Sequence, residues 1–430
     1  MKHIIYQVLP RLWGSGKLSE WDAPAFDYLK TLGVDCVWYT GIPRHASGQP
    51  FVKGDPGSPY SITDWKDINP YLAEDPGCRM AEFRTLVDRT HAAGLKVIID
   101  YIPNHVASDY SGPVRHFNYC DGDWTDTLKN DWSAAETRAE MAAILRFWVA
   151  LGVDGFRCDM VELVPADALK DLLAEVRKEY PGLLFIAEVY GKDNYRRYLE
   201  DVGFDLLYDK SGMYDRLRAV CSYSRPAKEL TWNWQWLGDM QPKMLNFLEN
   251  HDEQRLASPE FLGSPEKGFA PLAASLLFNT ASFMLYFGQE VGVNAEEGAG
   301  GRTSIFEWRK PAATDRLVSF IRTGKGLGRA ERSLLKRYRD FFKYAVKPAF
   351  AQGSVWDLCY CNYDSAGFDP ERHFAFVRYD DSSAFLVVCN FSFVTAEITV
   401  RMPQELEGIC GCSSRTVSAR PFDAEVIALK

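Results

Sequence analysis

The sequence contains no run of about 18 consecutive apolar residues, the length that a membrane-spanning helix needs. It has no cluster of Lys and Arg residues either, and its formal net charge is −9. Nucleic-acid binding depends on a basic face that neutralises phosphates, so this balance predicts no nucleic-acid partner and favours an uncharged one. The first residues show no apolar stretch followed by a cleavage site, so no secretory signal is expected.

Two further signatures are missing. No Gly-x-Gly-x-x-Gly motif follows the first apolar run, which argues against a dinucleotide-binding domain. The ten Cys residues include no Cys-x-x-Cys pair; the closest spacings are Cys359 to Cys361 and Cys410 to Cys412, which are not typical of zinc sites. Others, such as Cys36, lie in apolar runs and are expected to be small buried residues. We therefore expect free thiols and a cytoplasmic location, where thiols stay reduced.

Eight short apolar runs, rich in β-forming residues, do recur along the 430 residues, with amphipathic helical segments between them. Alternating strands and helices predict a parallel α/β architecture, and strands that are buried on both faces read as continuous apolar runs. Alternation alone leaves a (β/α)8 barrel and an open doubly wound sheet both possible. The eight runs are Ile4–Leu9, Val34–Thr40, Leu95–Tyr101, Val153–Asp159, Leu183–Val189, Phe204–Tyr208, Met244–Leu248 and Phe283–Phe287.

The pattern changes near residue 345, where short strands separated by turn residues replace the alternation. We predict an antiparallel β domain at 346–430. Residues 106–133, between the third run and the next helix, are rich in Asp, Gly and aromatic residues and are predicted to form a short inserted loop domain. The catalytic domain would then comprise residues 1–105 and 134–345.

Charged residues follow four of the apolar runs at their carboxyl ends. In an α/β barrel these ends converge on one face, which carries the catalytic groups. Any one acid there can be a satisfied charge at a strand end, but several acids on one face are costly to bury unless they are paired or functional. The residues are Asp100, Arg157, Asp159, Glu188, His251 and Asp252.

This set of side chains suits the hydrolysis of glycosidic bonds. Such chemistry needs one ionised carboxylate as nucleophile and one protonated carboxylic acid, held in different environments. Arg157 lies two residues before Asp159, so both point to the same side of a strand, and the guanidinium would keep that carboxylate charged.

Six segments, in this order and spacing, resemble the signature regions of the α-amylase superfamily, glycoside hydrolase family 13. The resemblance extends over nearly the whole chain and implies a (β/α)8 TIM barrel with a short loop domain after strand 3 and a C-terminal antiparallel β domain. The segments are residues 60–70, residues 100–105 (Asp-Tyr-Ile-Pro-Asn-His), residues 155–159 (Gly-Phe-Arg-Cys-Asp), Glu188, residues 250–252 (Asn-His-Asp) and residues 284–290.

The resemblance also implies a role for each residue. Asp159 would be the nucleophile, Glu188 the general acid and then base, and Asp252 the stabiliser of the transition state, with retention of the α-anomer. The implied substrate is a starch- or glycogen-derived α-glucan or maltooligosaccharide. The residues implied to bind it are Tyr60, Asp100, His105, Arg157 and His251.

One segment departs from the family. A Lys-His pair often follows the nucleophile by three and four residues, but Glu162 and Leu163 stand there in this chain. The pair contributes to the leaving-group side and to a calcium-linked loop, so both features are in question. The chemistry requires no cofactor, and calcium would have Asn104 as its one recognisable ligand. Arg302, after a Gly-rich loop, is a further candidate for contact with a substrate hydroxyl.

Two other functions remain open on the sequence. A transglycosylase would use the same residues and differ in whether a sugar outcompetes water as the acceptor. A catalytically inactive relative that acts as a binding subunit would typically have lost one of the three acids. All three are present here, which favours an enzyme.

Overall fold

The computed structural model describes residues 2–48, 52–296 and 299–429. Eight parallel strands close into a barrel in which β1 pairs with both β2 and β12, so the predicted barrel is confirmed and the open sheet is excluded. Each strand overlaps one of the eight predicted runs. The strands are β1 Ile4–Val8, β2 Cys36–Tyr39, β5 Lys96–Tyr101, β8 Gly155–Cys158, β9 Leu184–Ala187, β10 Leu206–Tyr208, β11 Met244–Phe247 and β12 Ser282–Tyr286.

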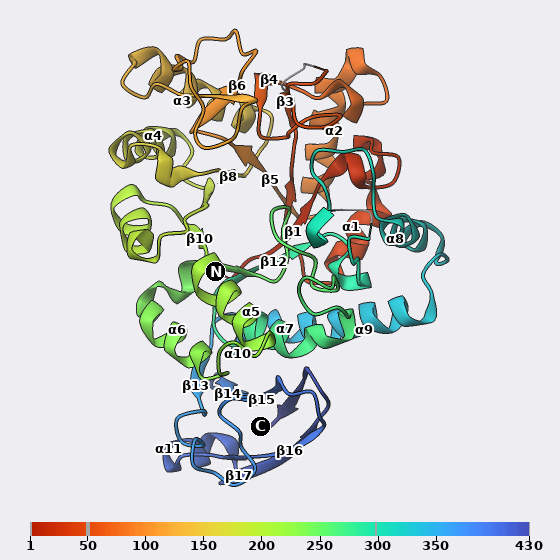
Figure 1. Cartoon of the computed structure of the whole chain (residues 1–430), viewed down its shortest axis with the longest axis vertical. Coiled ribbons are helices and arrows are strands. Elements are labelled where there is room, and N and C mark those ends of the chain that lie inside the picture. The colour runs from red at the N-terminus through yellow and green to blue at the C-terminus, as the bar shows by residue number, and fades with distance from the viewer. Residues whose placement is uncertain (1, 49–51, 297–298, 430) are drawn as a thin grey trace.

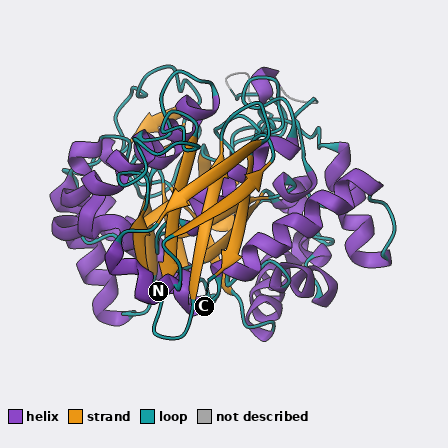
Figure 2. Cartoon of the chain, turned by 90° about the horizontal axis from the view of Figure 1, so that it is seen from below, coloured by secondary structure: helices purple, strands orange, loops and turns teal. Residues whose placement is uncertain are grey.

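Helices surround these strands, as Figures 1 and 2 show. Most connect one barrel strand to the next. The helices α8 and α9 follow the last strand, and α8 lies beside α1 whereas α9 lies beside α7. The helices are α1 Ala23–Lys30, α2 Arg79–Ala92, α3 Ala135–Ala150, α4 Ala166–Glu179, α5 Asp215–Cys221, α6 Glu229–Leu237, α7 Phe269–Leu277, α8 Ala312–Thr323 and α9 Arg329–Ala345. Two π-helical turns, at Arg197–Val202 and Lys210–Tyr214, flank β10.

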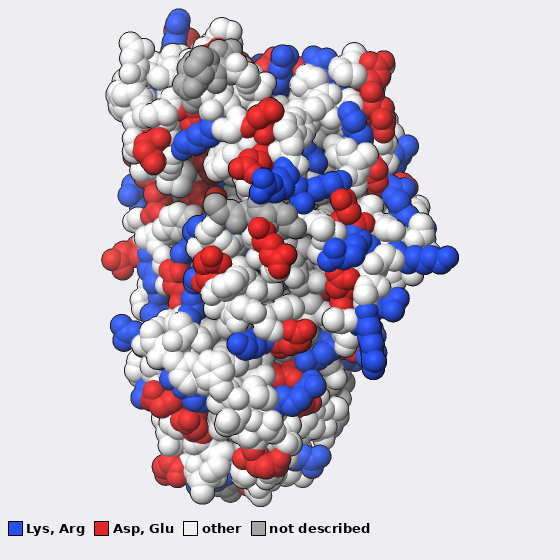
Figure 3. Space-filling model, turned by 45° about the vertical axis from the view of Figure 1, so that its right-hand side comes forward, with Lys and Arg blue, Asp and Glu red and all other residues white. Residues whose placement is uncertain are grey.

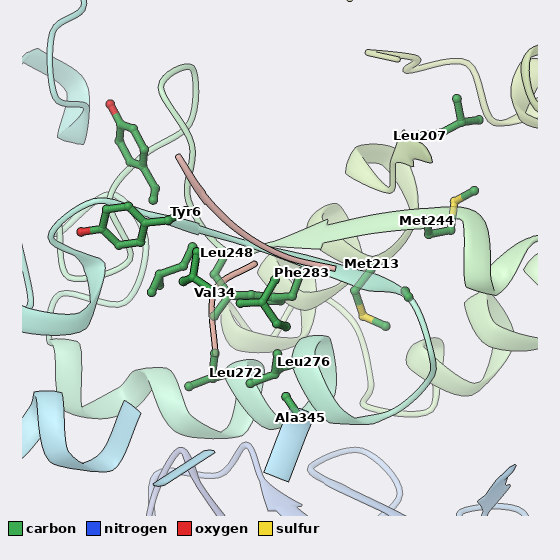
Figure 4. Close-up of a cluster of buried hydrophobic side chains, with 14 of the residues drawn as sticks. Tyr6, Val34, Leu207, Met213, Met244, Leu248, Leu272, Leu276, Phe283 and Ala345 are labelled. Atoms are coloured by element: carbon green, nitrogen blue, oxygen red, sulfur yellow. The ribbon is translucent and has the colours of Figure 1, made fainter. Parts of the chain in front are cut away.

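Strand alternation divides the core into two parts. One set of side chains fills the barrel, including Ile5, Trp38 and Met284. The other set lies between the strands and the helices; Figure 4 shows Phe283 of β12 near Leu272 and Leu276 of α7. Each fully buried side chain of this size contributes about 1.5–3 kcal/mol, so the two layers together hold the barrel closed.

Strand β8 places no large apolar side chain inside the barrel. Its inward residues are Gly155 and Arg157 rather than two apolar residues. A Cβ atom at position 155 would lie 2.7 Å from the carbonyl oxygen of Leu184 in β9, so only glycine allows the two strands to approach this closely. Arg157 therefore brings a charge into the apolar interior, directly below the carboxyl end of the barrel.

Two hairpins rise from the carboxyl-terminal side of the barrel. The first pairs β3 (Pro43–His45) with β4 (Ile62–Ile68), and the second pairs β6 (His105–Ala107) with β7 (Thr127–Lys129). The second hairpin lies in the region that was predicted to be a short inserted loop domain. Both hairpins contribute side chains to the pocket described below.

The C-terminal antiparallel sheet is confirmed, and it lies at the lower end of the molecule in Figure 1. Arg378 of β14 (His373–Tyr379) is buried and donates to the carbonyl oxygens of Phe278, Ala349 and Gly353, which ties the sheet to the barrel. The elements are α10 Pro348–Ala351, β13 Ser354–Asp357, β14 His373–Tyr379, β15 Ala384–Asn390, β16 Ala396–Arg401, α11 Gln404–Cys410, β17 Ser414–Ala419 and β18 Asp423–Ala428.

The surface carries charges of both signs. On the face shown in Figure 3, acidic and basic side chains are interspersed and neither sign forms a continuous field. Among the described residues, no helix combines the length and the apolar character that crossing a bilayer requires.

Candidate active site

A pocket of about 300 Å³ opens at the carboxyl ends of the barrel strands. Asp159 and Glu188 each follow directly on a strand, β8 and β9, and Asp252 lies in the loop after β11. The strand ends thus bring together three acids that are far apart in the sequence. The pocket is lined by Lys53, Ser58, Tyr60, His105, Trp124, Asp126, Thr127, Asp159, Met160, Glu188, Tyr190, His251, Asp252, Ile305 and Phe306.

Arg157 lies below the pocket floor, with no exposed surface. Its Nη1 atom is hydrogen-bonded to Asp159, and its Nη2 atom lies 2.7 Å from Glu188 Oε1, so one guanidinium pairs with both carboxylates. The guanidinium carbon also lies 5.5 Å from the ring centre of Trp38 and 5.4 Å from that of Tyr208. A fully buried charge is tolerated only when it is paired in this way, and the pairing fixes the positions of both acids.

Glu188 is held on both of its oxygens. Met160 N–H donates to Oε2 at 2.9 Å, and the Tyr190 hydroxyl donates to Oε1 at 2.8 Å. Met160 has φ 46°, a left-handed conformation that is uncommon for a non-glycine residue and turns its N–H toward Glu188. Burial, opposed by Arg157 and reinforced by the Asp159 carboxylate, raises the pKa of Glu188 above its usual range. Such a shift favours a protonated carboxyl near neutral pH.

The other two acids differ in their surroundings. Burial raises the pKa of Asp159, and the ion pair with Arg157 opposes that rise. The Asp252 side chain keeps 42% of its surface exposed toward the open pocket, and its pKa is raised by removal from bulk solvent and by the Glu188 carboxylate. Asn250 Oδ1 accepts from the backbone N–H of Asp252 at 2.8 Å, and this turn aims the side chain into the pocket.

Tyr60 forms one wall of the pocket and rests on His251. The two rings stack with centres 5.1 Å apart, and the Tyr60 hydroxyl lies 2.5 Å from His251 Nε2. The same hydroxyl donates to Asp100 Oδ1 at 3.2 Å. Burial raises the pKa of Asp100 to about 7, whereas burial and then the Arg157 charge lower that of His251 well below its usual value. A neutral imidazole can hydrogen-bond to a sugar hydroxyl without adding charge.

His105 lies across the pocket at the start of β6. Burial lowers its pKa to about 4, so this imidazole is also neutral at physiological pH. Its ring centre lies 5.6 Å from that of Trp124, in the loop before β7. Apolar rings beside neutral hydrogen-bonding groups are the usual lining of a sugar site, because sugar faces are apolar and sugar edges are polar.

Residues 23–127 and 115–333 match the family model described as "Alpha amylase, catalytic domain", which covers well over half of the chain. The chain belongs to this α-amylase family. Alpha-amylase MalA of Haloarcula japonica is 26% identical over 94% of this chain and 57% of its own length. The intracellular maltogenic amylase of Bacillus subtilis is 24% identical over 72% of this chain and 54% of its own length. The chain thus spans somewhat more than half the length of these curated relatives.

Solved structures share the fold over the full chain. The maltogenic α-amylase AmyB of Thermotoga neapolitana has a TM-score of 0.73 at 23% identity, and covers 100% of this chain and 97% of its own. An α-amylase of Lactobacillus plantarum has a TM-score of 0.75 at 20% identity, and covers 99% and 98%. At these identities the likeness concerns the fold, which is the amylase barrel with its C-terminal sheet.

Six of the eight residues predicted for the site line the pocket. The other two, Asp100 and Arg157, lie beneath it and act on the pocket through Tyr60, Asp159 and Glu188. Sequence reasoning missed several lining residues. The clearest omission is Tyr190, whose only signal was its position two residues after a predicted catalytic acid. The lining residues outside the predicted eight are Lys53, Ser58, Trp124, Asp126, Thr127, Met160, Tyr190, Ile305 and Phe306.

The structure also defines the surroundings of three residues that lie outside the family signatures. Arg302 Nε donates to the backbone carbonyl oxygen of Asp252 at 2.5 Å, so it supports the loop that carries this acid. Glu162, in place of the family's Lys, turns away from the pocket lining and accepts hydrogen bonds from the segment after Glu188. Leu163, in place of the His, is 37% exposed.

The surroundings of Asn104 do not fit a calcium ion. Its Oδ1 atom is buried without a hydrogen-bond partner, but its Nδ2 atom donates to Asp121 Oδ2 at 2.8 Å. Lys129 Nζ lies 3.0 Å from each oxygen of that same carboxylate. Calcium takes six to eight oxygen ligands. Here the Asp121 carboxylate beside Asn104 is already neutralised by the Lys129 ammonium group, which occupies the place that a metal ion would take.

Proposed function

We propose that this protein hydrolyses α-glucosidic bonds of starch- or glycogen-derived glucans with retention of configuration, by double displacement. The observation that carries the proposal is that one buried guanidinium, Arg157, holds the carboxylates of Asp159 and Glu188 side by side at the pocket floor. Two carboxylates that share one cation but differ in their hydrogen-bond donors can take different protonation states, as a retaining glycosidase requires.

In the first step, an Asp159 oxygen attacks the anomeric carbon and forms a β-glycosyl ester. The bond to the leaving-group oxygen breaks, and the Glu188 carboxyl gives its proton to that oxygen, so that no free alkoxide leaves. Positive charge develops on the sugar ring in the transition state. Asp252, on the open side of the pocket, is placed to stabilise this charge and the hydroxyls beside it.

In the second step, Glu188, now ionised, takes a proton from a water molecule that attacks the anomeric carbon from the side vacated by the leaving group. The ester bond to Asp159 breaks and its carboxylate returns to Arg157. Two inversions give net retention of the α-anomer. If a sugar hydroxyl replaces water in this step, the same residues perform transglycosylation.

The relatives support an α-glucan as the substrate class. They carry the names α-amylase, intracellular maltogenic amylase and cyclomaltodextrin glucanotransferase. The last name is the reason to keep transglycosylation as the second candidate. The pocket supports an uncharged sugar, because Trp124, Tyr60 and Phe306 line it together with neutral imidazoles.

The test is to follow maltoheptaose digestion by proton NMR and by product chromatography. We expect the α-anomer of the new reducing end to appear first and to mutarotate afterwards. Products no longer than the substrate indicate hydrolysis, whereas longer products indicate transfer to sugar. A β-anomer as first product would contradict the double displacement, and no turnover of maltoheptaose, isomaltose, pullulan or trehalose would contradict the function.

We also propose that activity needs no calcium, since Lys129 already neutralises Asp121 beside Asn104. Incubation with EDTA is expected to leave the melting temperature and the rate on maltoheptaose unchanged. Lys129→Met should lower the free energy of unfolding by about 1–2 kcal/mol, because it leaves a partly buried carboxylate unpaired. Lys343→Met, at a largely exposed ion pair, is the control and should change little. A melting temperature that falls with EDTA and recovers with calcium would contradict the proposal.

We place the enzyme in the cytoplasm. All ten cysteines are free thiols, including fully buried ones such as Cys158 and Cys389. Unpaired thiols in this number suit a reducing compartment, where they are not driven into disulfides. Titration of the folded and the unfolded protein with a thiol reagent after extraction should count ten reduced cysteines in total.

A further inference from the structure

The Tyr190 hydroxyl makes a hydrogen bond that the proposed reaction has not yet used. It donates to Glu188 Oε1 at 2.8 Å, and the ring is 37% exposed at the pocket wall. The same Glu188 oxygen lies 2.7 Å from Arg157 Nη2. A phenol with a pKa far above neutral remains a donor throughout the physiological range, and burial and the Glu188 carboxylate raise the pKa of Tyr190 further.

The segment that carries Tyr190 is held by one side chain. Glu162 Oε2 accepts from the backbone N–H groups of Tyr190 at 2.7 Å and Gly191 at 3.1 Å, and its Oε1 accepts from Asn194 Nδ2 at 2.6 Å. A Cβ atom at position 191 would lie 2.7 Å from Glu162 Oε1, so the fit depends on glycine. A carboxylate that accepts three charge-assisted hydrogen bonds is a strong clamp on a short segment.

The clamp occupies the position where the family often has a lysine. A lysine there has no acceptor to offer to two backbone N–H groups. Glu162 lies in the 3-10 turn Val161–Leu163, three residues after Asp159. It therefore connects the segment of the nucleophile with the segment of the general acid.

Other charged and titratable groups also face Glu188. Arg157 and Asp159 approach from β8, Tyr208 from β10, and Asp252 from the loop after β11. Arg157 favours the ionised form of Glu188, and the two aspartates oppose it. Lys210 lies further out, with Nζ 5.9 Å from the Tyr190 ring centre. Tyr190 differs from these groups because it is uncharged and donates a hydrogen bond to the Glu188 carboxylate, which lies two residues before it in the sequence.

We propose that Tyr190 is a positioning residue that tunes the proton affinity of Glu188 through its hydroxyl, and that Glu162 is the clamp that keeps it in place. The proposal rests on the assignment of Glu188 as general acid and base. A donor to a carboxylate stabilises the ionised form, so Tyr190 lowers the proton affinity of Glu188 and opposes the effect of burial. Glu188 can then give up its proton in the first step and still recover one in the second.

The decisive variant is Tyr190→Phe, measured as the pH profile of kcat/KM on maltoheptaose. The basic limb reports loss of the Glu188 proton, because the first step needs the protonated acid. Without the hydroxyl the ionised form loses a donor, so the basic limb should move to higher pH by about one unit. Tyr360→Phe, at an exposed ring in the loop after β13, is the matched control and should leave the profile unchanged.

Glu162 is tested by a double-mutant cycle. Glu162→Ala keeps the phenol but frees its segment, so its basic limb should move in the same direction as that of Tyr190→Phe. Glu162→Gln retains one acceptor oxygen and should restore part of the wild-type profile. Adding Tyr190→Phe to Glu162→Ala should produce no further shift, because both changes remove the same hydrogen bond. Additive shifts would show that Glu162 acts independently of Tyr190.

A substrate-free measurement separates this inference from the proposed function. In protein labelled with ¹³C at the Glu carboxyl, the Glu188 signal, assigned with Glu188→Gln, should titrate about one unit higher in Tyr190→Phe. An unchanged titration with a uniform loss of rate at every pH would overturn the inference. Loss of the expected glucan hydrolysis in the wild type, with the shift intact, would overturn the proposed function alone.

Discussion

Asp159→Asn is expected to reduce kcat/KM on maltoheptaose by roughly 10⁴-fold or more, the scale seen when an enzyme loses its nucleophile. Asparagine has nearly the same shape as aspartate but has no negative charge with which to attack the anomeric carbon. Arg157, fully buried beneath it, also loses one of its two counter-charges. Rates are to be compared on protein whose far-UV circular dichroism matches that of the wild type.

The stereochemistry of rescue makes this test specific. In Asp159→Ala, azide can enter the space of the missing carboxylate and attack an α-glucosyl fluoride once. A single displacement inverts the centre, so the product should be the β-glucosyl azide. Full activity of Asp159→Asn, or rescue to the α-azide, would contradict the assignment of Asp159 as nucleophile.

Glu188→Gln is expected to produce the second-largest effect, and its size should depend on the leaving group. Loss of a general acid typically costs 10²–10⁴-fold on substrates whose leaving oxygen needs a proton. A glucosyl fluoride or a dinitrophenyl glucoside needs little protonation, so the first step should be far less impaired and the glycosyl-enzyme should accumulate. Mass spectrometry of the quenched reaction would detect one glucosyl unit per protein.

Azide distinguishes the two acids in this variant as well. It needs no general base, so it should release the accumulated intermediate and accelerate turnover of the activated substrate. The attack comes from the α side of the ester on Asp159, so the product should be the α-glucosyl azide. An equal loss on maltoheptaose and on the activated substrate would mean that Glu188 is needed for binding and not for proton transfer.

Much of the barrel could be predicted from local pattern. Strands buried on both faces require apolar runs, and all eight predicted runs overlap a barrel strand. The catalytic face could be predicted because acids stand at the carboxyl ends of several runs, as at Asp159 and Glu188. Closure into a barrel could not be derived from the runs alone, since it depends on the pairing of β1 with β12, two strands about 280 residues apart.

The supporting contacts of the site could not be predicted in the same way. Nothing near Lys129 in the sequence shows that its ammonium meets Asp121 beside Asn104, because the three come from opposite ends of a hairpin and its loop. The role of Glu162 was equally hidden. The departure from the family pattern showed that a lysine is replaced. It did not show that the Glu162 carboxylate accepts hydrogen bonds from the backbone 28 residues later.

By itself, the sequence determined the fold class and the identities of the three acids, since both strand burial and residue type can be recognised within short segments of the chain. Only the tertiary structure decided how those acids differ. Whether a carboxyl is ionised depends on burial, on a shared Arg157 and on donors such as Tyr190, and these are properties of distances between atoms. Such distances are set by strand pairing and loop packing, which join residues that the linear order keeps apart.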